Sequence, residues 1–214
     1  MSTQAIDVIF YIAILIMSVV IHEISHGFMA EKLGDNTARV AGRLTLNPIK
    51  HLDLFGSIIL PVLLYLSAGF AFGWAKPVPY NPNNLRNKRY GTVAVASAGV
   101  LANLFIALLF GLIIRLAPYF GLAPFDSFAV LPFYKIMIDI VFINIALATF
   151  NLIPIPPLDG SKILFNLLPG SIYRVSDFLE RYALIFLVIF IVFFSNYLYP
   201  ILAFIFHLVT GLRL

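Results

Sequence analysis

Cysteine is absent from this 214-residue chain, and charged residues are scarce. Without cysteine the chain can form neither disulfide bonds nor thiolate metal sites. Charged residues make up 11% of the chain, about half the usual share, whereas 61% of the residues are hydrophobic. Such a chain has too little polar surface for a soluble globular protein, and several apolar stretches approach the ~20 residues needed to cross a bilayer. The composition therefore predicts an integral membrane protein.

The sequence also lacks internal repeats, low-complexity tracts and any soluble segment longer than a loop. We therefore expect one all-α polytopic membrane domain over residues 1–214, with about five to six transmembrane helices. The last two helical segments are separated only by Tyr197–Pro200, which predicts a tight hairpin or one kinked helix. The predicted helices cover residues 6–33, 91–117, 135–153, 178–196 and 198–211.

The region between the first two clear helices, residues 37–90, has a mixed pattern. Residues 37–47 alternate between apolar and polar side chains, and this period of two favours a short β-strand over a helix. Residues 52–72 are apolar but are interrupted by Gly56, Pro61 and Gly69. These interruptions favour a re-entrant segment, although a full crossing is the alternative.

The 14 basic residues, against 10 acidic ones, give a formal net charge of +4. Because these basic residues are spread over short loops, the positive-inside rule of membrane proteins explains them better than a nucleic-acid partner does. If residues 52–72 are re-entrant, twelve basic residues share one side of the membrane and only Arg115 and Lys135 lie opposite; otherwise the split is six against eight. The rule favours the first model, with five crossings of the cell membrane and the N-terminus outside. No basic residue precedes the first apolar run and no cleavage site follows it, so we expect a retained anchor.

Three ionisable side chains, His22, Glu23 and His26, lie inside the first apolar segment as a His-Glu-x-x-His motif. Histidines four residues apart on a helix point to the same side, so one zinc ion can accept both, with a carboxylate beside them. Ionisable groups at that depth are costly unless they are paired or ligated. Metal binding is therefore the leading hypothesis; the alternative is a hydrogen-bonded cluster, as in a proton pathway.

A second polar group follows the helix predicted at 135–153 and reads Asn-Leu-Ile-Pro-Ile-Pro-Pro-Leu-Asp-Gly, from Asn151 to Gly160. Three prolines must unwind the helix and expose Asp159 on a bend. Irregular backbone at membrane depth survives where it is buried in protein or lines a wet cavity. Asp159 is thus a candidate third ligand, although alone it could equally cap the next helix.

Together the two groups resemble the site-2 protease family of intramembrane zinc metalloproteases, in its small prokaryotic form without PDZ or CBS domains. The resemblance covers residues 22–27, 97–103 and 151–160, with further similarity at 73–79. It implies that His22, His26 and Asp159 hold one Zn²⁺ per chain and that Glu23 is the catalytic carboxylate. The asparagines Asn103, Asn144 and Asn151 are candidates for holding the oxyanion or the substrate backbone, and interhelical hydrogen bonding is the alternative.

The chemistry also follows from the residues themselves. Two neutral imidazoles and one carboxylate leave the fourth position of zinc open for water, whose pKa the metal lowers to around 7. Glu23 is placed to take the water proton and deliver it to a leaving amine. Because lipid excludes water, a polar inlet must reach the site from the nearer face, which we expect to be cytoplasmic.

The leading functional hypothesis is an intramembrane zinc endopeptidase that cleaves in or next to a transmembrane helix of another membrane protein. Such a substrate helix must be locally unwound, and the edge of the strand predicted at 37–47 could pair with it, although an amphipathic loop is the alternative. The rival hypothesis is a membrane metal-ion or proton carrier, which would more often show duplicated halves. A catalytically inactive scaffold is a third possibility.

Overall fold

The computed structural model describes residues 3–59, 75–121, 132–168 and 173–213, together with Leu63 and Leu66. These residues are mostly helical and include no β-strand, which confirms the all-α class. The α-helices are α1 (Thr3–Lys32), α2 (Thr37–Val40), α4 (Lys88–Leu116), α5 (Pro132–Asn151), α6 (Asp159–Leu167), α7 (Tyr173–Arg181) and α8 (Ala183–Thr210). Short 3-10 turns form η1 (Pro48–His51), η3 (Pro82–Asn84) and η4 (Ala117–Phe120), and η2 (Leu54–Ile59) is a π-helical turn.

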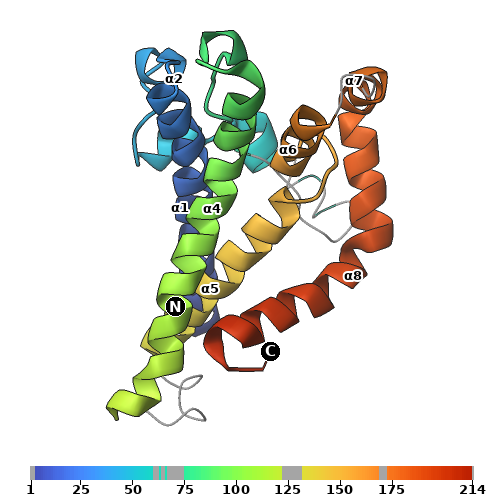
Figure 1. Cartoon of the computed structure of the whole chain (residues 1–214). Helices are drawn as coiled ribbons and strands as arrows, with labels where there is room; N and C mark the ends of the chain where they lie inside the picture. Colours follow the sequence, from blue (N-terminus) through green and yellow to red (C-terminus); the bar gives the residue numbers. More distant parts are fainter. Residues whose placement is uncertain are drawn as a thin grey trace.

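Helix α4 is the centre of the bundle and packs against α1, α5, α6 and α8. Helices α1 and α5 run in one direction and α4 runs in the other (Figure 1). Small residues on α4 permit this close packing: a Cβ on Gly111 would lie 2.2 Å from Val209 of α8. The shared direction of α1 and α5 brings the late part of α1 and the end of α5 to the same end of the bundle.

The main apolar core lies between α4, α5 and α8, at the end of the bundle opposite α2. It is built from the buried residues Ala107, Ile114, Ala117, Tyr134, Met137, Val141, Ile145, Phe206 and Val209. Elsewhere large apolar side chains cover the outside: Phe105 and Phe193 are each 67% exposed. A contiguous apolar surface of this extent requires a lipid environment.

Three helices among the described residues are long and apolar enough to cross a membrane: Ile6–Lys32, Lys88–Phe120 and Pro132–Asn151. The two halves of α8 make a fourth span if they are counted together, with a bend of 74° between Phe194 and Asn196. The expectation of five to six transmembrane helices is therefore not supported. Pro200 lies inside α8 and does not end it. A proline ring clashes with the carbonyl four residues earlier, here that of Asn196, which is next to the bend.

The strand predicted at 37–47 is wrong. Asp35 accepts hydrogen bonds from the backbone N–H and the hydroxyl of Thr37, the first residue of the single helical turn of α2. Gly42 then adopts a left-handed conformation, with φ of 63°, which interrupts any extended run. Burial does not follow the alternation either, because Val40 is 86% exposed whereas Arg43 is buried. The idea that this stretch offers a strand edge to a substrate fails with it.

The re-entrant segment predicted at 52–72 lies largely outside the described residues. Of this range the structure describes Leu52–Ile59, Leu63 and Leu66, and Leu54–Ile59 forms η2.

Candidate metal centre

The late part of α1 carries the two histidines on the side that faces α4. The helical repeat places His22 and His26 one turn apart, with their ring centroids 4.6 Å apart and their planes nearly perpendicular. Both side chains are buried. Gly99 of α4 lies opposite, and a Cβ on it would come within 2.6 Å of the His26 ring and 2.7 Å of the His22 ring. Glycine at this position is therefore what allows both imidazoles to fit.

Asp159 reaches the histidines because the short connection after α5, residues 152–158, sets the start of α6 against the end of α5. Its neighbour Gly160 makes this approach possible, since a Cβ there would lie 2.2 Å from the carbonyl oxygen of Leu152. At the other end of α6, Arg89 of α4 donates to the carbonyls of Asn166 and Leu167, over 2.6 and 2.7 Å. The short helix is thus fastened at both ends, and its first residue is held against α1.

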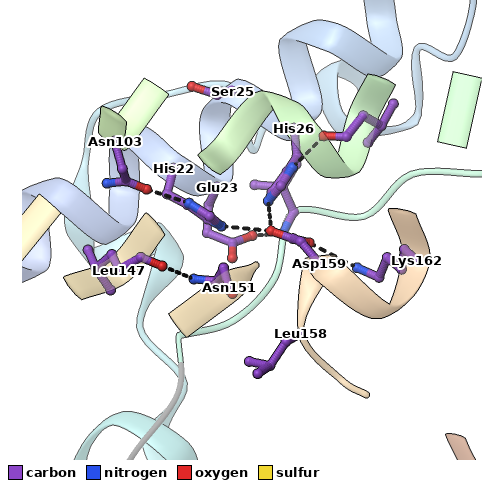
Figure 2. A network of polar contacts seen from close by, with 12 residues as sticks. His22, Glu23, Ser25, His26, Asn103, Leu147, Asn151, Leu158, Asp159 and Lys162 are labelled. Atoms are coloured by element: carbon purple, nitrogen blue, oxygen red, sulfur yellow. Dashed lines mark hydrogen bonds and ion pairs between the residues drawn. The ribbon is translucent and has the colours of Figure 1, made fainter. Parts of the chain in front are cut away.

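The two histidines and Asp159 converge on one point (Figure 2). Asp159 Oδ2 lies 3.0 Å from His22 Nε2 and 3.1 Å from His26 Nε2. One ligand atom from each of the three residues lies within 4.8 Å of the other two, and all three residues are buried. The other two histidines, His51 of η1 and His207 of α8, hydrogen-bond to carbonyls elsewhere.

The donor set fits a zinc ion. His26 Nδ1–H donates to the backbone carbonyl of Val95, over 2.7 Å, so its Nε2 carries the free lone pair. His22 Nδ1 is likewise occupied, at 2.5 Å from Asn103 Oδ1, on the side of the ring away from Asp159 (Figure 2). Two Nε2 atoms and one carboxylate oxygen thus face the same point, as in catalytic zinc sites with three protein ligands.

Asp159 is held as a carboxylate. Burial alone would raise the pKa of its carboxyl group, but the adjacent rings of His22 and His26 and the nearby positive charge of Lys162 lower that pKa well below its usual value. Lys162 lies one helical turn along α6, with its Nζ 3.5 Å from Asp159 Oδ1. The oxygen that does not face the histidines is therefore the one that faces the lysine.

Glu23 lies beside the ligand group and is held by a segment from the other side of the site. We call residues 75–81 the strap. The backbone N–H of Val78, in the middle of the strap, donates to Glu23 Oε2 over 2.8 Å. Arg43 accounts for the position of the strap, because its guanidinium donates to the carbonyls of Lys76 and Pro77, over 2.7 and 3.3 Å. One oxygen of Glu23 is thus fixed.

A cavity of about 120 Å³ adjoins these groups. At ~30 Å³ per molecule it has room for a few waters. It is lined by His22, Glu23, His26, Pro77, Val78, Tyr80, Val95, Ala96, Asn151, Pro157, Asp159 and Lys162. Neither Asn103 nor Asn144 lines this cavity, whereas Asn151 does.

Sequence reasoning missed the residues that hold the predicted ligands. Ser18 accepts a hydrogen bond from Asn144, Lys162 lies beside Asp159, and the strap residue Val78 donates to Glu23. Helical spacing offered a signal for two of them, because Ser18 precedes His22 by four residues and Lys162 follows Asp159 by three. No spacing predicts the contact between Val78 and Glu23, which are 55 residues apart.

Comparison with known proteins decides the family. The model of peptidase family M50 matches residues 119–194, which include Asp159 but not the His-Glu-x-x-His motif. A protein of Bacillus subtilis named "Putative zinc metalloprotease YwhC" is 39% identical over 192 residues, covering 88% of this chain and 83% of that protein. The chain belongs to peptidase family M50.

Two mycobacterial relatives are similar at lower identity. The protein named "Putative zinc metalloprotease Rip2" of Mycolicibacterium smegmatis is 33% identical over 153 residues, covering 71% of this chain and 54% of that protein. Its namesake in Mycobacterium tuberculosis is 28% identical over 174 residues, covering 81% and 63%. No solved structure matches the chain.

Membership of family M50 confirms the resemblance to the site-2 proteases and the predicted class of intramembrane zinc metalloprotease. It also confirms zinc as the cofactor, for which the His-His-Asp group is suited. The carrier hypothesis is not favoured. With several apolar helices, this M50 chain is a multi-pass membrane protein.

Proposed function

We propose that this chain hydrolyses peptide bonds in or next to transmembrane helices of other membrane proteins, using one zinc ion held by His22, His26 and Asp159. The observation that carries the proposal is the convergence of these three side chains beside Glu23, in one cavity of an M50 chain. The ligands come from α1 and α6, which are 137 residues apart at the His22–Asp159 contact. We take residues 1–214 to form a single metalloprotease domain.

Zinc in this position supplies Lewis acidity, which brings the pKa of a bound water to around 7 and polarises the scissile carbonyl. Glu23 handles the protons. Its carboxylate lines the cavity and takes a proton from the attacking water, then returns it to the nitrogen of the leaving amine. The N–H of Val78 holds Glu23 Oε2 during both transfers, and this contact keeps the carboxylate directed at the reacting groups.

Asn151 is the asparagine that we assign to the substrate. Its amide donates to the carbonyl of Leu147 over 3.0 Å and the side chain lines the cavity. It is therefore within the space that a substrate carbonyl must enter, and it supports the developing oxyanion. The roles predicted for Asn103 and Asn144 at the oxyanion stay predictions, and their placement outside the cavity favours a different role.

We place the site near the cytoplasmic face, with the N-terminus outside. Lys32, at the end of α1, and Lys88, at the start of α4, mark the same end of the bundle as the ligand group. Most basic residues lie in the short elements and connections at this end. In this arrangement the C-terminus lies outside, whereas the sequence pattern predicted it on the cytoplasmic side. Arg115 donates to the carbonyl of Leu208, so Arg213 lies with Arg115 and the charge bias keeps its sign.

The test is the substitution Glu23→Gln in purified protein reconstituted into liposomes. The probe is a set of single-span model proteins labelled on both sides of the transmembrane helix. We expect Glu23→Gln to retain bound zinc and to lose at least about 10²-fold in cleavage rate, because general base catalysis contributes 10²–10⁴-fold. Glu31→Gln is the matched control on the same helix. Glu31 pairs with Arg39, and the Glu31→Gln protein should cleave at the parent rate.

Zinc or proton flux across the liposomes that survives Glu23→Gln, with no cleavage by the parent protein, would contradict the proposal and restore the carrier hypothesis.

A further inference from the structure

A row of buried polar side chains on the side of His22 away from Asp159 has no part in the proposed chemistry. Ser18 of α1, Asn103 of α4 and Asn144 of α5 are 4%, 0% and 0% exposed, and none of them lines the cavity. Burying a polar side chain costs about 1–3 kcal/mol unless it is hydrogen-bonded. Three helices thus bring polar groups to one point on the side of His22 away from Asp159.

The direction of the hydrogen bonds among these polar side chains is fixed by backbone carbonyls. Asn144 Nδ2 donates to the carbonyl of Ile140 over 2.9 Å and to Ser18 Oγ over 2.9 Å. A carbonyl can only accept, so the amide of Asn144 cannot be turned round, and its Oδ1 must face Asn103. Asn103 therefore presents its Nδ2 to Asn144, over 2.7 Å, and also to the carbonyl of Ser18, over 3.4 Å.

This direction determines where His22 carries its proton. With Nδ2 of Asn103 facing Asn144, its Oδ1 faces His22 at 2.5 Å and can only accept. His22 must therefore be protonated at Nδ1, which in the neutral ring leaves the lone pair on Nε2, the atom that faces Asp159. His26 reaches the same state more simply, through the backbone carbonyl of Val95.

We propose that Asn103 and Asn144 are positioning residues that lock His22 in the Nδ1–H tautomer and so present its Nε2 to the metal. The inference rests on the proposed zinc site, but the tautomer itself can be measured without metal. It assigns to both asparagines a role remote from the substrate. The amide of Asn144 sets the amide of Asn103, and Asn103 in turn sets His22.

The tautomer is read by ¹⁵N NMR of protein labelled on histidine, of which the chain has only four. An Asp159→Ala background removes both the bound metal and the carboxylate that faces the two Nε2 atoms. At alkaline pH in this background we expect His22, assigned with a His22→Gln variant, to carry its proton on Nδ1. Adding Asn103→Leu should remove this preference. A proton on Nε2 of His22 before that addition, or an unchanged spectrum after it, would overturn the inference.

Zinc affinity gives the second readout, by competition with a chromogenic chelator in otherwise unaltered protein. We expect Asn103→Leu to weaken zinc binding about 10–100-fold, the usual loss when the partner of a metal-bound histidine is removed, and Asn144→Leu to weaken it less.

The control is Thr210→Val, which removes a buried side-chain hydrogen bond to Phe206 far from the site and should leave zinc affinity unchanged. Should Asn103→Leu not fold, Asn144→Leu carries the comparison. Equal zinc affinity in the leucine variants and the parent would overturn the inference. A parent protein that binds no zinc would refute the proposed function instead, and the tautomer measurement would still decide this point.

Discussion

At the scale of single residues, the site depends on two glycines as much as on its ligands. Gly99 leaves room for both imidazoles, and Gly160 lets α6 start against the carbonyl of Leu152. That the three proposed ligands lie together was predictable from sequence, because HExxH spacing and the Leu-Asp-Gly after three prolines each indicate a local geometry. The partners of His22 were not, since the orientation of Asn103 depends on a carbonyl of a third helix, at Ile140.

The substitution Gly99→Ala tests the packing of the imidazoles. Its Cβ would lie 2.6 Å from His26 Nε2, so we expect the rings to separate and the dissociation constant for zinc to rise by at least about tenfold, as for other disturbed ligand orientation. Gly111→Ala is the matched control, because it clashes with Val209 at 2.2 Å but lies far from the metal. Both variants should unfold at lower temperature. Equal zinc affinity in the two variants would refute the role given to Gly99.

At the scale of elements, apolar length predicted α1, α4 and α5 to within a few residues. The failures occurred where side chains or backbone outweigh the pattern: Asp35 and Gly42 replace the strand at 37–47 with a helical turn, and Pro200 bends α8 without ending it. Tertiary contacts of this kind join residues remote in sequence. The strap is an example, because it is held by Arg43 through the carbonyl of Lys76 and by Asp35 through the N–H of Asn81.

Asp35 fastens the end of the strap to the end of α1, and this tie predicts a pH dependence. The buried carboxylate accepts from the Asn81 N–H over 2.6 Å and from Asn84 Nδ2 over 2.8 Å, as well as from Thr37. Burial opposes ionisation, but these hydrogen bonds lower its pKa below the ordinary 3.8. Its contribution to stability is therefore complete above 3.8 and is lost as the pH falls through the lower, folded-state pKa.

We expect Asp35→Asn to lower the free energy of unfolding by about 1–3 kcal/mol at neutral pH, because an amide cannot accept all of these bonds. The difference between parent and variant should shrink as the pH is lowered below 3.8, which thermal unfolding in detergent would measure. Asp177→Asn, at an exposed position on α7, is the control and should show no such trend. A difference that is constant through this range of pH would refute the assignment.

At the scale of the whole molecule, the absence of cysteine makes the topology directly measurable. Single cysteines at Lys50, Tyr119 and Arg213, labelled with a membrane-impermeant maleimide in oriented vesicles, report the side of each position. If α8 crosses once, Tyr119 and Arg213 label from one side and Lys50 from the other, which we take as cytoplasmic. Labelling of Arg213 from the same side as Lys50 would show an additional crossing and contradict the fourth span.

The most direct test of the central claim is zinc X-ray absorption of the purified, metal-loaded protein, with the metal content measured on the same sample. We predict one zinc per chain, bound by nitrogen and oxygen atoms only, with two imidazoles in the first shell and distances of about 2.0–2.2 Å. His22→Ala and Asp159→Ala should lose the metal. Folded protein that retains no zinc, or zinc bound undiminished in Asp159→Ala, would contradict the account.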